Sequence, residues 1–247
     1  MNKILLVAGH GAGDPGAVNG SNNERDAMRA LAKAVKALLP NTVDVYDPAR
    51  NMYYDTVNGG GMHSTKYKEV IELHMDSERT GTVRGGHVII RTGYKPDALD
   101  KRLADAVKHL VGIKGQFLNA QGFSYRTNLL NLNIAARRGI SYRLVEFGFI
   151  SNAQDRKAMI TEVANAAKHV ASAITGKTVA PQKPAPPKEV DELTQLLPDT
   201  QQKDMKALLA KAYQDKVFTK DHSQKVDKMT RGEALDLLIS YTARTAK

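Results

Sequence analysis

Four side chains that can bind a metal or carry a proton stand where elements of structure should begin or end. His10 and His74 each close an apolar run, Glu146 lies within the apolar segment LVEFGFI, and Glu24 follows a glycine-rich stretch. Two imidazoles and one carboxylate around an open fourth position form the ligand set of a catalytic zinc site. A second carboxylate, not bound to the metal, would then carry the proton during hydrolysis.

Each of these residues also has an ordinary structural explanation. A single histidine in a strand is most often structural, and a glutamate such as Glu24 is favoured in the first turn of a helix by the helix dipole. Glu146 is harder to explain in this way, because a carboxylate in an apolar strand is costly to bury unless it is paired or coordinated. Together the four residues favour a metal site, but their spacing leaves open whether they meet in space.

The segments that would position these residues alternate between strand and helix. Apolar or alternating runs predict strands, and apolar residues at helical spacing predict helices. This order predicts an α/β fold with a twisted, largely parallel sheet flanked by helices, whose ligands gather beyond the carboxyl ends of the strands. The predicted strands are 3–9, 42–47, 69–75, 87–93 and 141–150, and the predicted helices are 24–39, 97–111, 129–139 and 155–176.

A proline-rich segment divides the chain. Proline stands at positions 181, 184, 186 and 187, and this composition favours an extended spacer. We therefore predict a catalytic domain over 1–176, a linker over 177–190 and a small, mostly helical domain over 191–247. The small domain contains two amphipathic stretches, and the second begins with the capping-box residues Thr230 and Glu233.

Composition narrows the class of protein. The 247 residues include no cysteine, which excludes disulfides, thiolate metal sites and cysteine nucleophiles. No run approaches the ~20 apolar residues of a membrane span, so we expect none. The net charge of +10 suits an anionic partner. Nucleic acid is disfavoured, because the basic residues form no cluster with interleaved aromatics and no helix-turn-helix pattern, and an anionic cell-wall polymer meets the same charge.

The motifs resemble those of the zinc-dependent N-acetylmuramoyl-L-alanine amidases of bacterial autolysins and phage endolysins. The resemblance covers about residues 3–174 and rests on LVAGHGAGDPGAVNG, on Glu24, on IELHMD and on LVEFGFISNAQD. It implies that His10, Glu24 and His74 bind one zinc ion and that Glu146 is the catalytic carboxylate. The implied reaction is hydrolysis of the amide between N-acetylmuramic acid and L-alanine in peptidoglycan, in which Glu146 passes a proton from water to the leaving amine.

Three more residues are candidates for contact with substrate. His87 in RGGH either lines the site or begins a strand, and Arg126 and Asn128 fall where this family tends to contact its substrate. Residues 51–68, which contain three consecutive glycines and three tyrosines, are expected to form a loop over the substrate groove.

The N-terminal segment MNKILLVAGHG lacks the features of a secretory signal, and with the two-domain layout this predicts a phage or prophage endolysin. Such an enzyme is made in the host cytoplasm and acts at the cell wall after release. We expect residues 191–247 to bind an anionic secondary wall polymer, because TRGE is faintly similar to the helix start of S-layer-homology modules. The alternative is oligomerisation through this domain, since a unit of this size can need a partner to bury its apolar faces.

Other functions remain open from the sequence. A zinc peptidase or deacetylase acting on cell-wall substrates would use the same ligands on a different bond, and its products would identify it. A non-catalytic wall-binding protein would have lost the site, although all four residues are present. Nucleic-acid binding is supported by the net charge alone.

Overall fold

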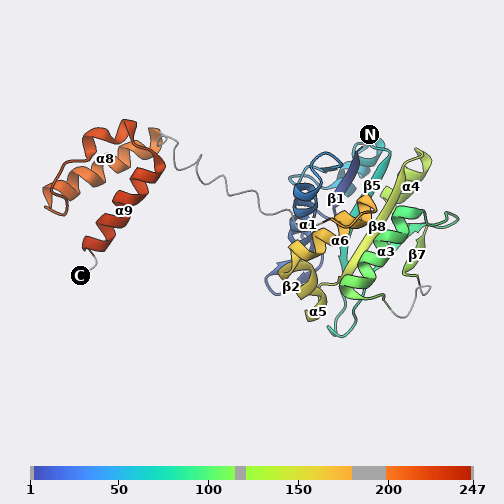
Figure 1. Cartoon of the computed structure of the whole chain (residues 1–247). Coiled ribbons are helices and arrows are strands. Elements are labelled where there is room, and N and C mark those ends of the chain that lie inside the picture. Colours follow the sequence, from blue (N-terminus) through green and yellow to red (C-terminus); the bar gives the residue numbers. More distant parts are fainter. Residues whose placement is uncertain (1–2, 115–120, 180–198, 246–247) are drawn as a thin grey trace. The chain divides into compact units, whose positions relative to one another are not determined.

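The computed structural model describes residues 3–114, 121–179 and 199–245. The chain divides into two compact units, Met1–Pro181 and Gln182–Lys247, each with a hydrophobic core of its own (Figure 1). Most of the predicted linker lies outside the described residues, as does the beginning of the predicted small domain. None of the helices in the described ranges has the length and apolar character needed to cross a membrane.

Unit 1 is built on a six-stranded sheet with the strand order β4-β1-β5-β8-β6-β7. The strands β4, β1, β5 and β8 run parallel, whereas β6 is antiparallel to β8 and parallel to β7. The predicted α/β class with a largely parallel sheet is therefore confirmed. The strands are β1 (Ile4–Ala8), β4 (Val43–Val45), β5 (Glu69–Asp76), β6 (His87–Arg91), β7 (Phe123–Arg126) and β8 (Ser141–Phe149), and β2 (Val18–Asn19) and β3 (Asn22–Asn23) form a separate small hairpin.

Helices cover both faces of the sheet (Figure 1). Successive strand residues point to opposite faces, so Leu6 belongs to the apolar cluster that contains residues of α1, α3 and α6, while Leu5 belongs to the cluster that contains residues of α2 and α4. The helices are α1 (Glu24–Leu38), α2 (Met52–Val57), α3 (Ala98–Val111), α4 (Leu130–Arg137), α5 (Ala153–Arg156) and α6 (Val163–Thr175). A short turn of helix, η1 (Gly61–His63), follows α2, and a π-helical turn, η2 (Lys157–Thr161), joins α5 to α6.

Some predicted elements differ from the structure. Residues 51–68 contain α2 and η1 where we expected a loop, because the Asn51 side chain caps α2 and Met62 is buried in the core. Strand β7 was not predicted, because four residues at a sheet edge are too few to show an alternation of apolar and polar residues. The single helix expected over 155–176 is interrupted by the π-helical turn.

A fully buried arginine joins three elements of unit 1. The Arg143 side chain on β8 is 1% exposed, and its nitrogens donate to Asp100 on α3 at 2.8 Å, to Asp97 at 2.9 Å and to Glu69 on β5 at 2.9 Å. A buried charge is tolerated when it is paired, and each of the three guanidinium nitrogens has at least one acceptor. The cluster therefore holds α3 against the sheet.

Removing this cation should destabilise unit 1. We expect Arg143→Met to lower the free energy of unfolding by about 3–5 kcal/mol, because the buried Asp100 carboxylate would lose its partner. Urea unfolding followed by circular dichroism would measure the change. Arg137→Met, at an exposed position on α4, is the control and should shift stability by less than about 0.5 kcal/mol. Equal stability of Arg143→Met and wild type would show that the cluster contributes nothing.

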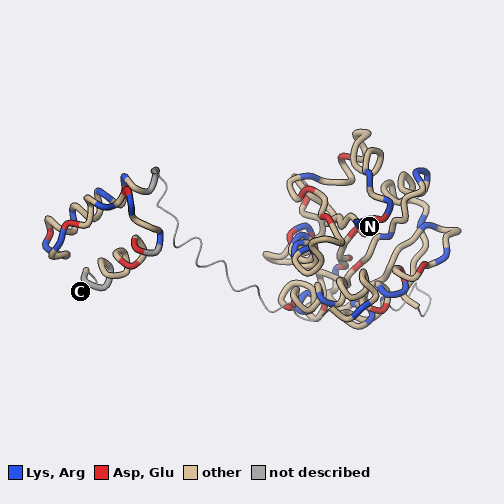
Figure 2. The backbone as a smooth tube through the Cα atoms, turned by 45° about the horizontal axis from the view of Figure 1, so that its top comes forward, with Lys and Arg blue, Asp and Glu red and all other residues tan. Residues whose placement is uncertain are grey.

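Unit 2 is helical. It contains α8 (Asp199–Gln214), η3 (Ser223–Lys228) and α9 (Arg231–Thr245), which pack around their own apolar cluster. The predicted capping box is present, because Thr230 donates its backbone N–H to Glu233 at 2.8 Å and its hydroxyl accepts the Glu233 N–H at 3.3 Å. Figure 2 shows lysine and arginine distributed over both units, so the positive charge is not a property of unit 2 alone.

Candidate metal centre

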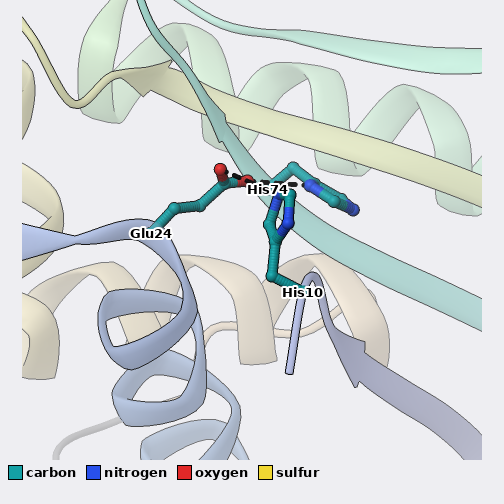
Figure 3. A group of neighbouring side chains, drawn as sticks. All are labelled: His10, Glu24 and His74. Atoms are coloured by element: carbon teal, nitrogen blue, oxygen red, sulfur yellow. Dashed lines mark hydrogen bonds and ion pairs between the residues drawn. The ribbon is translucent and has the colours of Figure 1, made fainter. Parts of the chain in front are cut away.

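Three of the predicted residues converge at the carboxyl edge of the sheet (Figure 3). His74 lies near the end of β5, His10 follows β1, and Glu24 is the first residue of α1. Because β1 and β5 are parallel neighbours, their ends bring the two imidazoles together, with ring centroids 5.1 Å apart. Glu24 lies between them, with Oε2 2.9 Å from His10 Nε2 and Oε1 2.8 Å from His74 Nδ1.

The Glu24 carboxylate is held in place by the start of α1. Asn23 caps this helix by accepting the Asp26 N–H at 2.9 Å, which places Glu24 in its first turn. The carboxylate is buried and accepts the backbone N–H groups of Ala17 and Met75, each at 3.0 Å. Glu24 is thus a fixed, buried anion, unlike a solvated glutamate that only complements the helix dipole.

Glycines allow the backbone to pass directly beside the imidazoles. A Cβ on Gly9 would lie 2.2 Å from the His74 ring, and a Cβ on Gly16 would lie 2.5 Å from the His10 ring. His10 itself has a φ of 66°, a left-handed conformation that is uncommon outside glycine. Close packing in the glycine-rich stretch therefore determines where both rings lie, and the strain at His10 is of the kind found at functional sites.

The pKa values of the three residues are set by their contacts with one another. Burial opposes ionisation of Glu24, but its hydrogen bonds to His10 and His74 outweigh burial and hold its pKa well below the usual range. Burial also lowers the pKa of each histidine, yet hydrogen bonds to Glu24, with Asp14 for His10 and Glu72 for His74, outweigh it and raise both pKa values. One ligand atom from each of the three residues lies within 4.8 Å of the others.

Metal binding at this centre should therefore be pH-dependent. Because the pKa values of His10 and His74 are raised when no metal is bound, each imidazole holds its proton to a higher pH than an ordinary histidine, whereas Glu24, whose pKa is lowered, has none to lose. A metal ion must displace those protons, so zinc affinity should rise with pH and binding should release protons. Calorimetry of zinc binding in buffers of different ionisation enthalpy would count them. An affinity that is the same at pH 6 and pH 8 would contradict this expectation.

A second group of ligand-type side chains lies on the same edge of the sheet. Single ligand atoms of Asp76, His87 and Glu146 are within 4.8 Å of one another. Lys114 donates to Asp76 at 2.9 Å, so its ammonium group already offsets negative charge among these side chains. The ring of His87 is buried, with Nδ1 2.8 Å from the Ser124 hydroxyl, and burial lowers the pKa of His87 to about 4. This histidine is therefore neutral at pH 7.

Glu146 belongs to the second group and is also the cross-strand neighbour of His74 in the first. It pairs in register with His74 on β5 and with His87 on β6, so the three side chains share one face of the sheet. Its Oε2 atom is buried and, among the residues that the structure describes, has no hydrogen-bond partner. Burial raises the pKa of Glu146 to about 8. A carboxyl group with a free oxygen and a pKa near neutrality is suited to accepting and returning a proton.

A cavity of about 330 Å³ opens beside His10 and His74. Tyr53 and Tyr54 on α2 line it with side chains that are about half exposed, and Asn128 also lines it. Its other lining residues are Asp14, Asn51, Glu72, Leu129, Leu130, Asn131, Tyr142 and Leu144. Arg126 and His87 do not line this cavity, and contact of either residue or of Asn128 with substrate stays a prediction.

Sequence reasoning missed two carboxylates that contact the histidines. Asp14 Oδ2 lies 2.9 Å from His10 Nδ1, and Glu72 Oε1 lies 3.1 Å from His74 Nε2. A signal for Glu72 existed, because residues two apart in a strand share a face and Glu72 precedes His74 by two. Asp14 lies in an irregular glycine-rich loop, where no periodicity indicates which side chains meet.

Comparison with known proteins identifies relatives of unit 1. A family model described as Amidase_3, N-acetylmuramoyl-L-alanine amidase, matches residues 4–176. The "Probable autolysin PH" of Staphylococcus aureus is 35% identical over 196 residues, which are 72% of this chain and 39% of that protein. The chain thus spans about two fifths of the length of this curated relative.

Solved structures share the fold. The catalytic domain of the CD27L endolysin targeting Clostridia difficile superposes with a TM-score of 0.57 at 19% identity, covering 73% of this chain and 100% of that one. The CwlD amidase from Clostridioides difficile, solved in complex with the GerS lipoprotein, gives a TM-score of 0.55 at 20% identity, covering 70% and 94%. At such identities the similarity establishes the architecture of unit 1.

Proposed function

Because the chain belongs to the N-acetylmuramoyl-L-alanine amidase family, we propose that it cleaves the amide between N-acetylmuramic acid and L-alanine in peptidoglycan with one zinc ion. The observation that supports the zinc site best is the buried Glu24 carboxylate, 2.9 and 2.8 Å from nitrogens of His10 and His74. Two imidazoles and a carboxylate, in a chain without cysteine, are a ligand set that suits zinc in a hydrolase.

The residues of this chain would divide the work of amide hydrolysis. Zinc, when bound, supplies a Lewis acid for the amide carbonyl and lowers the pKa of the attacking water. Glu146 takes the proton from that water and returns it to the leaving amine of L-alanine, which would otherwise leave poorly. A pKa raised toward neutrality allows the same carboxyl to act first as base and then as acid.

The cavity beside His10 and His74 is where we place the substrate. Tyr53 and Tyr54 offer exposed aromatic faces for the glycan, and the amide groups of Asn128 and Asn131 can pair with peptide groups of the stem.

The test is the identity of the bond that is cut. The full chain, incubated with purified peptidoglycan, should release new N-terminal alanine, should lose this activity to a chelator and should regain it with zinc. A peptidase would free other amino groups, and a deacetylase would free acetate. Either of those products without N-terminal alanine would overturn the proposal.

We further propose that the protein serves as a phage or prophage endolysin, with unit 2 as a wall-binding module. The net charge of +10 suits an anionic secondary wall polymer, and tethering would raise the local concentration of unit 1 at its substrate. In the alternative, unit 2 joins two chains. Sedimentation of the full chain with purified walls measures wall binding, and light scattering without walls measures the oligomeric state. A monomer that binds walls supports the wall-binding module, and a dimer that does not bind walls supports oligomerisation through unit 2.

A further inference from the structure

The buried carboxylate of Glu72 lies beneath both the metal centre and the cavity. Glu72 is 5% exposed and is surrounded by three polar groups. Its Oε1 is 3.1 Å from His74 Nε2, and its Oε2 accepts the Asn131 amide N–H at 2.9 Å and the hydroxyl of Tyr142. A buried carboxylate with this many partners is neither solvated nor left unpaired, so its position is well determined.

The chemistry of a carboxylate fixes what its neighbours must do. An ionised carboxylate accepts hydrogen bonds and donates none, so His74, Asn131 and Tyr142 must each turn a donor toward Glu72. His74 must therefore carry a proton on Nε2, so a metal ion that displaces a proton from this ring must do so at Nδ1. That same Nδ1 is the atom 2.8 Å from Glu24, on the side of the candidate metal ligands.

Asn131 is constrained in the same way. Since its amide nitrogen faces Glu72, its oxygen Oδ1 faces away from the carboxylate. Asn131 is 4% exposed and lines the cavity, yet Oδ1 is buried and has no hydrogen-bond partner among the residues that the structure describes. Such an orphaned acceptor is costly unless a ligand or water completes it.

We propose that Glu72 is the positioning residue of this site, which makes His74 bind zinc through Nδ1 and presents Asn131 Oδ1 as the acceptor for an N–H group of the peptide part of the substrate. This inference rests on the proposed amidase function, because it assumes the same zinc and the same substrate. Asp14 plays the corresponding part for His10, where it occupies Nδ1 and leaves Nε2 toward Glu24. With zinc bound, the two ligand histidines would be opposite tautomers, each set by its own carboxylate.

The tautomers can be observed without any variant. The full chain, labelled with ¹⁵N-histidine and loaded with zinc, should show two zinc-bound imidazoles in a long-range ¹H–¹⁵N correlation spectrum. One ring should be protonated at Nδ1 (His10) and the other at Nε2 (His74). Two zinc-bound rings that are both protonated at Nδ1 would overturn the assignment for His74 and, with it, the role of Glu72.

Zinc affinity tests whether Glu72 acts on the metal centre. Glu72→Gln keeps the shape of the side chain but removes its charge, and the loss of such a partner weakens metal binding by about 10–100-fold. Glu69→Gln, on the same strand but paired with Arg143, is the matched control and should bind zinc as wild type does. A purely structural role for Glu72 would lower thermal stability while leaving the zinc affinity of the folded protein unchanged, and that result would contradict the proposal.

The substrate contact has a separate measurement. Asn131→Ala should raise KM for a soluble muropeptide by about 10-fold, the loss expected for one hydrogen bond, while zinc affinity stays within about twofold. An unchanged KM would remove Asn131 from substrate recognition.

These outcomes are distinct from failure of the proposed function. A wild-type chain that binds no zinc or releases no alanine refutes the amidase proposal. A chain that binds zinc and releases alanine, but has two rings bound through Nε2, refutes only the inference on Glu72.

Discussion

Replacing Glu146 with glutamine should reduce release of N-terminal alanine from purified walls by about 10²–10⁴-fold, the usual contribution of a general acid–base group. Glutamine fills the same space but cannot take a proton from water or return it to the amine. Zinc content should stay at the wild-type level, because Glu146 is not among the three residues that we assign as ligands. Metal analysis and the alanine assay on the same preparation measure both quantities.

The matched control is Glu162→Gln, an exposed glutamate of the same unit, which should keep full activity. Two results would contradict the role of Glu146. If the Glu146→Gln variant lost its zinc, the carboxylate would belong to the metal centre. If it kept its activity, the proton would travel by another group, and His87, which pairs with Glu146 across β8 and β6, would be the next to replace.

Gly9→Ala should weaken zinc binding by about 100-fold or more and lower activity with it. The added Cβ would lie 2.2–2.6 Å from three atoms of the His74 ring, so the ring must leave its present position beside Glu24 and His10. Since loss of an outer partner alone costs about 10–100-fold in metal affinity, displacement of a ligand should cost at least the upper end of that range. Competition with a chromophoric chelator would measure the affinity.

Gly13→Ala separates crowding from backbone strain. Gly13 belongs to the same loop and has a φ of 77°, but a Cβ there would meet no atom within 4 Å. Alanine at this position should cost about 1 kcal/mol of stability and leave zinc affinity unchanged. If both substitutions weakened zinc binding equally, flexibility of the glycines, and not the close approach of Gly9 to His74, would explain their presence.

The sequence was sufficient to predict the strands and helices whose apolar residues recur with a clear period. Strands such as β1 and β5 and amphipathic helices such as α1 and α3 were predicted within a few residues, because their burial repeats every two or every 3.6 residues. The reversed direction of β6 could not be predicted in this way, since alternation is the same for a strand running in either direction. The edge strand β7 has only four residues, too few for a period to be visible.

The same physics explains which parts of the site could be predicted. His10, His74 and Glu146 stood out because polar groups interrupted or closed apolar runs, and the parallel sheet brings such ends to one edge. Glu72 and Asp14 contact the same histidines; the only sequence signal is that Glu72 shares a strand face with His74, and nothing in the immediate sequence distinguishes Asp14 from a surface carboxylate. Their place depends on contacts across strands and within an irregular loop, which periodicity does not describe.

The order of the strands has a consequence for how unit 1 folds. No neighbouring pair in the six-stranded sheet is a hairpin, and even β6 and β7, which are next to each other in the sequence, pair Val88 with Phe123. Long chain segments must therefore close before any ladder of this sheet forms, and topologies dominated by distant contacts fold slowly. His10, Glu24 and His74 meet only once β1 and β5 have paired. Zinc binding should therefore occur late in refolding, and its rate would report when the sheet is complete.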